Sequence, residues 1–143
     1  MNTVICSLLI LCILPLVCAW TAGFYRQKQL GSVDNKEPRL QSLQLTGAGA
    51  RAVAAQGNTW EALAVYSAAI LAVFVSGLEL QSITTLAIVF VALRVVYIPV
   101  YISNLDKLRS LIFLAGFGIC MYLFYLALSA NGYPPISGTN DTQ

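Results

Sequence analysis

Histidine is absent from this 143-residue chain, and charged residues make up only 10% of it. The first absence excludes histidine-based metal sites and catalytic triads. The second is far below the roughly 25% found in soluble domains, and 58% of the residues are hydrophobic. A net charge of +2 without a basic run gives no support for nucleic-acid binding. The composition therefore predicts an integral membrane protein.

The four cysteines occur without a CxxC motif and without the spacing of zinc ligands. Three of them, Cys6, Cys12 and Cys18, lie in one apolar stretch, and the fourth is Cys120. Free cysteine in such a stretch behaves as a small apolar side chain. We therefore interpret them as inert thiols rather than as metal ligands.

Four apolar segments fill most of the chain, and about 20 residues suffice to cross the hydrocarbon core of a bilayer. They predict a single all-α domain over residues 1–143, an antiparallel bundle of four transmembrane helices. The expected helices cover residues 2–25, 45–77, 83–102 and 106–130, and a disordered tail is expected at residues 136–143. The first is interpreted as a retained span bent near Pro15, since it lacks the positive start of a signal peptide. A kink is expected at Pro99 in the third.

The charges of the connections predict the orientation in the membrane. The first and third connections hold six basic residues, namely Arg26, Lys28, Lys36, Arg39, Lys107 and Arg109. The second connection and both termini hold none. The positive-inside rule therefore places the first and third connections in the cytoplasm and both termini outside. Compact loops and the absence of a retrieval signal favour a bacterial inner membrane over the endoplasmic reticulum.

Polar side chains interrupt the second predicted span. On a helix with about 100° per residue, Asn58 lies roughly 20° and Glu61 about 80° from Arg51, so the three share one face. A charge at bilayer depth costs about 2.5–3.5 kcal/mol on insertion scales. Such residues are expected to serve a polar site inside the bundle.

The third span carries a similar stripe. Tyr97 and Tyr101 lie about 60° and 20° from Arg94, and Arg109 opens the fourth helix at the same end of the bundle. Three separate elements are therefore expected to bring their polar groups to one depth. Such a pocket suits a small zwitterion with excess negative charge that enters from the cytoplasm.

Each cluster also has a simpler interpretation. Asn58 and Glu61 fit an interhelical hydrogen-bonded knot of the kind found in membrane bundles. The Arg94 stripe fits an anchor at headgroup depth, where tyrosine and arginine are favoured. Arg109 alone is a topology signal. The expected convergence of all three clusters favours a binding site.

The pattern R-x-x-x-A-Q-x-N-x-x-E over residues 51–61, with R-x-x-Y-x-x-x-Y over residues 94–101 and then Arg109, resembles a known family. These are the membrane-associated proteins in eicosanoid and glutathione metabolism, the MAPEG family. It includes microsomal glutathione transferases, leukotriene-C synthase and microsomal prostaglandin E synthase. The resemblance covers all four spans, roughly residues 8–130.

The resemblance implies a homotrimer that binds glutathione between neighbouring subunits and takes a lipophilic small molecule from the membrane lipid. It implies a glutathione transferase or peroxidase activity, with Arg109 as the catalytic residue beside the sulfur. The implied glutathione-binding residues are Arg51, Gln56, Asn58, Glu61, Arg94, Tyr97 and Tyr101. A thiol with a pKa of about 8.5 is only a few per cent ionised at pH 7, so a nearby arginine that favours the thiolate makes physical sense.

Two positions depart from the pattern of leukotriene-C synthase. Ala54 stands where that pattern has an arginine, and Ala62 stands where it has a tyrosine. Both departures favour the alternative of a non-catalytic relative that binds lipid or a partner protein. A small transporter is a third possibility, opposed by the absence of an internal repeat.

Overall fold

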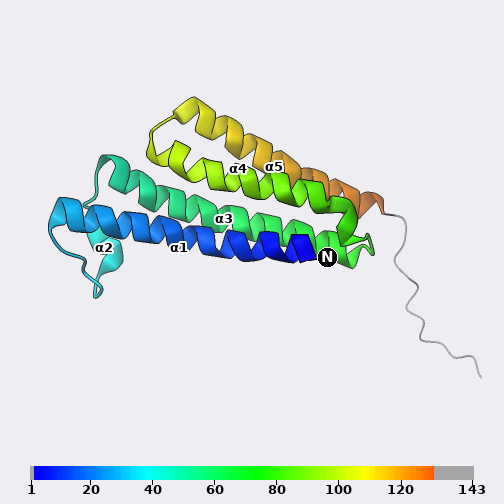
Figure 1. Ribbon diagram of the computed structural model, residues 1–143, viewed down its shortest axis with the longest axis horizontal. Coiled ribbons are helices and arrows are strands. Elements are labelled where there is room, and N and C mark those ends of the chain that lie inside the picture. The colour runs from blue at the N-terminus through cyan, green and yellow to red at the C-terminus, as the bar shows by residue number, and fades with distance from the viewer. Residues whose placement is uncertain (1, 131–143) are drawn as a thin grey trace, which may run out of the picture.

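The computed structural model describes residues 2–130 as an all-helical bundle (Figure 1). Its helices, in chain order, are α1 (Asn2–Leu30), α2 (Pro38–Ser42), α3 (Gly47–Val75), η1 (Leu80–Ile83), α4 (Thr84–Ile102) and α5 (Asp106–Ser129). No strand occurs between residues 2 and 130. The tail expected at residues 136–143 lies outside this range.

Four of these helices are long and apolar enough to cross a membrane: α1, α3, α4 with the preceding η1, and α5. In cross-section, α1 and α5 each pack against both α3 and α4. Successive long helices run in opposite directions, and their connections lie at the two ends of the bundle (Figure 1). The all-α bundle of four transmembrane helices expected from the sequence is confirmed.

The first connection differs from the expected one. Helix α1 runs five residues further than predicted and ends before Gly31, which adopts φ +76° and whose N–H bonds to the Gln27 carbonyl at 3.1 Å. This is the usual role of glycine after a helix C-terminus. Pro38 then starts α2, a short helix between the first two predicted spans, because proline is well tolerated at the first helical position. Helices α1 and α4 continue through Pro15 and Pro99.

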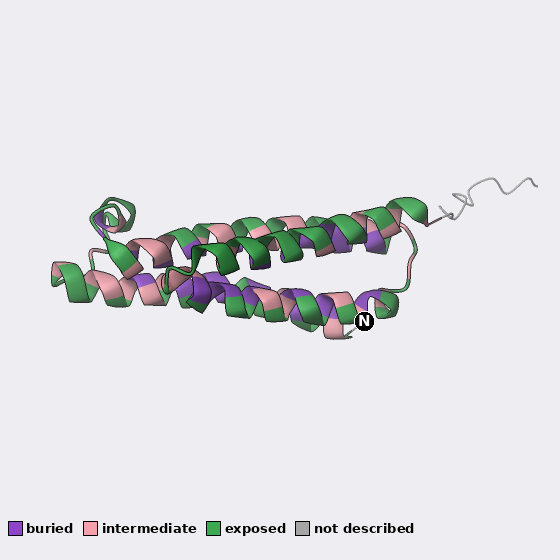
Figure 2. Cartoon of the chain, turned by 90° about the horizontal axis from the view of Figure 1, so that it is seen from above, coloured by how far each residue is buried: buried purple, intermediate pink, exposed green. Residues whose placement is uncertain are grey.

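The buried residues lie on the inward faces of the helices, and the outer faces are exposed (Figure 2). The ring of Tyr66 stacks on Phe90 with centroids 4.3 Å apart, and its hydroxyl bonds to Ser7 Oγ at 2.8 Å. Large apolar side chains such as Leu111 and Leu128 are exposed on the outside. This distribution suits a bundle surrounded by lipid, which solvates such side chains.

One end of the bundle collects the basic residues of the first and third connections, because α1 and α4 end there and α3 and α5 begin there (Figure 1). Helices α1 and α3 approach closely at this end. A Cβ added at Gly49 would lie 3.0 Å from Cβ of Tyr25. The side chain of Gln29 also bonds to the backbone N–H and carbonyl of Thr46, at 3.0 and 3.2 Å. From the positive-inside rule we expect this end to lie in the cytoplasm.

Candidate functional site

Four side chains form a continuous series of cation–ring and ring–ring contacts along α4 and into α5. The guanidinium of Arg94 lies 4.2 Å from the ring centre of Tyr97, and that ring meets Tyr101 edge-on at 5.5 Å. Arg109 then lies over the other tyrosine, with its Cζ 4.6 Å from the ring centre of Tyr101. Cations are attracted to ring faces at these distances. We call these four residues the arginine–tyrosine ladder.

The spacing of these four residues along the chain explains the arginine–tyrosine ladder. Residues 94, 97 and 101 lie on one face of α4, and the link between α4 and α5 is only three residues long. Helix α5 therefore turns back against the end of α4 and brings Arg109, in its first turn, over Tyr101. The stripe predicted from the sequence and the arginine of the fourth helix do come together.

The ladder is joined to α3 through Asn58. Nη2 of Arg94 donates to Asn58 Oδ1 at 2.9 Å, with the Asn58 backbone carbonyl further away at 3.4 Å. A guanidinium can only donate, so the side-chain atom of Asn58 facing Arg94 must be the oxygen. The amide N–H donors of Asn58 are thereby left for another acceptor.

A polar cavity of about 400 Å³ lies beside the ladder, between α3, α4 and α5. Four of the predicted site residues line it together with Ser110, Phe113 and Leu114, namely Asn58, Tyr97, Tyr101 and Arg109. The volume is within the range of small-molecule sites. Its polar lining consists of an amide, hydroxyl groups and one guanidinium, a set that favours an anionic ligand.

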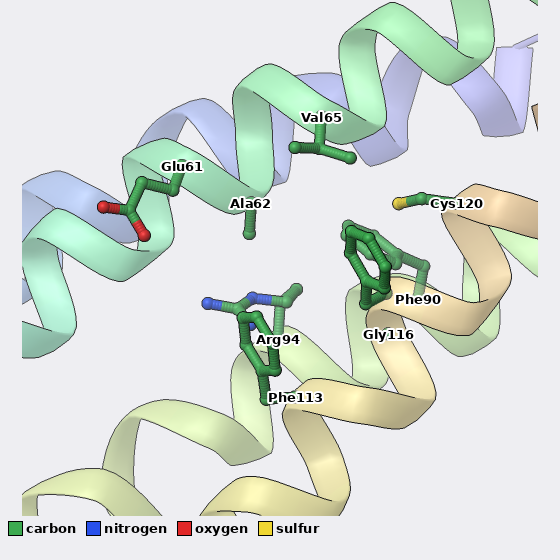
Figure 3. A pocket seen from close by; sticks show the side chains of 9 residues that line it. Glu61, Ala62, Val65, Phe90, Arg94, Phe113, Gly116 and Cys120 are labelled. Atoms are coloured by element: carbon green, nitrogen blue, oxygen red, sulfur yellow. The ribbon is translucent and has the colours of Figure 1, made fainter.

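A second, apolar cavity of about 160 Å³ adjoins the first, since Phe113 lines both (Figure 3). Two predicted site residues, Glu61 and Arg94, line it. Its other walls are apolar or small side chains from the same three helices: Ala62, Val65, Phe90, Phe113, Gly116, Phe117 and Cys120.

Among residues 2–130, neither charge of this second cavity contacts a side chain of opposite charge. Arg94 is only 1% exposed, contacts Asn58 and Tyr97, and has no acceptor for its Nε. Glu61 lies on the exposed face of α3, about 21 Å along the helix from Gly47. A carboxylate at that depth is costly unless a ligand or another chain meets it. Both groups therefore mark an incomplete site.

Two predicted site residues lie elsewhere. Nε of Arg51 donates to the Ile102 carbonyl at 2.8 Å, where a cation complements the C-terminal end of α4. Gln56 lines a separate groove of about 570 Å³ between α1, α2 and α3, with Arg26, Arg39 and Trp60. Within the chain the structure thus joins six of the eight predicted residues around two cavities that share Phe113.

The aromatic walls of the apolar cavity were missed by sequence reasoning. Phe90, Phe113 and Phe117 are ordinary residues of a membrane span, and their types carry no signal for a cavity. The small side chains of Ala62 and Gly116 on two facing helices are the only available hint. Within residues 2–130, no cluster of His, Cys, Asp and Glu is suited to hold a metal ion.

The sequence model of the MAPEG family matches residues 3–129, which is nearly the whole chain. No curated protein and no solved structure gives a significant match.

Proposed function

This chain belongs to the MAPEG family, and from that premise we propose that it is a membrane glutathione transferase or peroxidase. Its family places it among membrane proteins of glutathione and eicosanoid metabolism. The proposed reaction activates the glutathione thiol for attack on a lipophilic electrophile. We also propose a bacterial inner membrane as its location, from the compact loops noted above.

The observation that carries this proposal is the lining of the polar cavity. Glutathione has two carboxylates and one ammonium group, so it needs donors and cations more than acceptors. Asn58 is oriented by Arg94 so that its N–H groups are free, and Tyr97 and Tyr101 add hydroxyl groups. Arg109 supplies the cation at the same cavity.

Arg109 is the proposed catalytic residue. Its Cζ lies 4.6 Å from the ring centre of Tyr101, and Arg109 also lines the cavity, so its N–H donors can meet a ligand there. Lowering the pKa of a thiol from about 8.5 to below 7 takes about two pKa units, which is about 2.7 kcal/mol. One arginine near the sulfur in a partly dry site can supply that preference for the thiolate. The thiol proton passes to water, and the sulfur becomes the nucleophile.

The other members of the ladder hold this geometry. Tyr101 provides the platform for Arg109, and Tyr97 connects that platform to Arg94. Arg94 fixes the amide of Asn58. Arg94 is therefore proposed as a positioning residue rather than a catalytic one.

The exposed polar groups support assembly into the proposed homotrimer. Glu61 faces outward from α3, while Gln56 lies on a different face of α3 and lines a groove together with Arg26 of α1. A single protomer cannot bring both faces to one ligand. A neighbouring copy that presents its Gln56 groove to the Glu61 face would complete a glutathione site between subunits.

A non-catalytic role in lipid binding is the second candidate, and the apolar cavity favours it. Ala62 leaves that space empty at a position where a polar aromatic side chain would fill it. A relative that only holds a lipid needs such a cavity and does not need a thiolate.

Ultraviolet absorbance of the glutathione thiolate distinguishes the two. The purified protein with bound glutathione should show the thiolate band at pH 7, and Arg109→Leu should abolish it while leaving the protein folded. Lys107→Leu is the matched control, because it removes an exposed cation two residues away that does not line the cavity. Glutathione binding by the native chain without a thiolate band, or no glutathione binding, would favour the lipid-binding role. A thiolate band of equal size in Arg109→Leu would refute Arg109 as the catalytic residue.

A further inference from the structure

The groove of about 570 Å³ between α1, α2 and α3 is positively charged. Arg26 of α1 and Arg39 of α2 line it, and none of the described residues in its lining is acidic. Ala19 and Trp60 line it closer to the middle of the bundle. We propose that this groove, called the basic groove below, binds the headgroup of one anionic phospholipid from the leaflet at this end of the bundle.

The basic groove lies at the depth where the hydrocarbon of a bilayer meets its headgroups. Helix α1 has 29 residues and is about 43 Å long, whereas the hydrocarbon core is about 30 Å thick. Its last turns, which include Arg26, therefore reach the headgroup region. Ala19 lies two turns earlier, about 10 Å deeper along the helix axis. A phospholipid fits these two levels, with its phosphate at the arginines and the start of an acyl chain beside Ala19.

Arg26 has an unused hydrogen-bond donor. Its Nε is buried and has no acceptor among residues 2–130. A buried donor without an acceptor is costly, and a guanidinium matches the oxygens of a phosphate particularly well because it can donate two parallel hydrogen bonds. A phosphate in the basic groove supplies the missing acceptor to Arg26 and meets the charge of Arg39 at the same time.

The acidic residues of the first connection leave this positive charge in place. Oδ1 of Asp34 accepts the backbone N–H groups of Lys36 and Glu37, at 2.7 and 3.3 Å. Asp34 and Glu37 also line a separate hollow of about 230 Å³ rather than the basic groove. Two arginines without an acid complement an anionic headgroup better than a zwitterionic one, whose own ammonium group already balances its phosphate.

Helix α2 carries exposed apolar side chains that suit a membrane surface. Leu40 and Leu43 are 56% and 81% exposed, although the connection that holds them is largely polar. Helix α2 contacts α1 and lies beside the end of that helix (Figure 1). At this depth the headgroup and upper acyl region of a bilayer covers such leucines. Exposed leucine next to basic side chains is typical of a segment that lies on an anionic bilayer.

The lipid site is independent of the proposed glutathione site. Gln56 lies on the α3 side of the basic groove, whereas the two arginines belong to α1 and α2. Gln56 therefore stays available to a ligand of the neighbouring subunit. A chain that bound no glutathione would still present the same arginines to the bilayer.

Native mass spectrometry tests the assignment, because it counts the lipids that remain on each protomer. The purified chain in detergent is titrated with phosphatidylglycerol or with phosphatidylcholine, and the Kd of the first bound lipid is measured for each. The chain should bind phosphatidylglycerol at least fivefold more tightly, the scale of one basic residue at an anionic surface, about 1 kcal/mol. Equal Kd values for the two lipids would overturn the proposal.

Four variants locate the site. Arg26→Gln and Arg39→Gln should each bring the preference for phosphatidylglycerol below twofold. Lys28→Gln and Lys36→Gln are the matched controls, because they remove the same charge from exposed positions that do not line the basic groove. Both controls should keep the preference. Equal losses in all four variants would show a diffuse attraction to the basic end and refute the site. Arg39 is exposed, so Arg39→Gln decides the matter even if Arg26→Gln does not fold.

Two additions identify the anion that the arginines hold. Millimolar inorganic phosphate should not displace phosphatidylglycerol, because a free ion has no acyl chain to place beside Ala19. Millimolar glutathione should not displace it either. Displacement by phosphate would assign the arginines to a soluble anion, and displacement by glutathione would assign them to the glutathione site; either result would overturn the proposal. Selective lipid binding in a chain without a thiolate band would sustain the lipid site and refute the transferase.

Discussion

Arg94 on α4 holds the amide of Asn58 on α3 through a 2.9 Å hydrogen bond in which Asn58 Oδ1 is the acceptor. The bond lies where Arg94 is almost completely buried, and it joins the two spans that carry most of the polar residues. Because the arginine can only donate, it dictates which end of the amide faces the cavity. The donors of the polar cavity therefore depend on the orientation of the Asn58 amide as much as on the types of the residues that line it.

Asn58→Asp tests that orientation. An aspartate keeps an oxygen for Arg94, so the thermal midpoint of unfolding in detergent should not fall. The cavity loses two N–H donors and gains an anion, so the glutathione Kd should rise at least tenfold, as expected when a hydrogen bond to a charged group worth about 1.5–3 kcal/mol is lost. Calorimetric titration gives the Kd. An unchanged affinity would mean that Asn58 does not meet the ligand.

Tyr101 should act through its ring. Tyr101→Phe keeps the surface on which Arg109 lies and should retain most of the thiolate band. Tyr101→Leu removes that surface, and a cation–ring contact is worth about 0.5–1 kcal/mol at a partly exposed site. The thiolate fraction at pH 7 should therefore fall by about two- to fivefold. If Tyr101→Phe and Tyr101→Leu lose the thiolate band equally, the hydroxyl group of Tyr101 matters for the thiolate rather than its ring.

Arg51 should contribute to stability more than to binding. Its hydrogen bond to the Ile102 carbonyl ties α3 to the end of α4. Arg51→Met should lower the free energy of unfolding by about 1–2 kcal/mol, the scale of a hydrogen bond plus a favourable charge at a helix end. Denaturant unfolding measures the loss. A variant of native stability that no longer binds glutathione would show instead that Arg51 is a ligand-binding residue, as the family pattern implies.

Glu61→Gln separates a ligand-binding role from an architectural one. The change removes the charge and keeps the shape of a side chain that faces outward from α3. We expect the oligomer measured by native mass spectrometry to be the same as that of the unaltered chain, with weaker glutathione binding. Failure to assemble would show that Glu61 holds subunits together rather than a ligand.

Much of this bundle could be anticipated because helical spacing is a strong signal. The i, i+3, i+7 pattern of Arg94, Tyr97 and Tyr101 fixes one face, and a short link forces Arg109 back over it. The same arithmetic separates Gln56 from Asn58 by about 200°, so those two residues lie on different faces of α3. A family pattern groups them without saying which face of the helix each one serves.

Other features lay beyond sequence reasoning for physical reasons. The reach of a long arginine side chain decides whether Arg51 points to a cavity or to the carbonyl of Ile102, and spacing does not fix that. The apolar cavity depends on how Ala62 and Gly116 face each other across two helices. In a membrane span, the sequence does not distinguish a leucine, valine or phenylalanine that faces a ligand from one that faces lipid or a neighbouring helix.

The groove that contains Gln56 also contains one of the two tryptophans, Trp60, whose side chain is 48% exposed in the protomer. Its indole is thus a built-in optical reporter of whatever covers that face. In a Trp20→Phe chain Trp60 is the only tryptophan, so a change in its emission reports association with a neighbouring copy at that face. Quenching by brominated lipid, recorded for a Trp20→Phe chain, would then reveal whether that face meets lipid or protein.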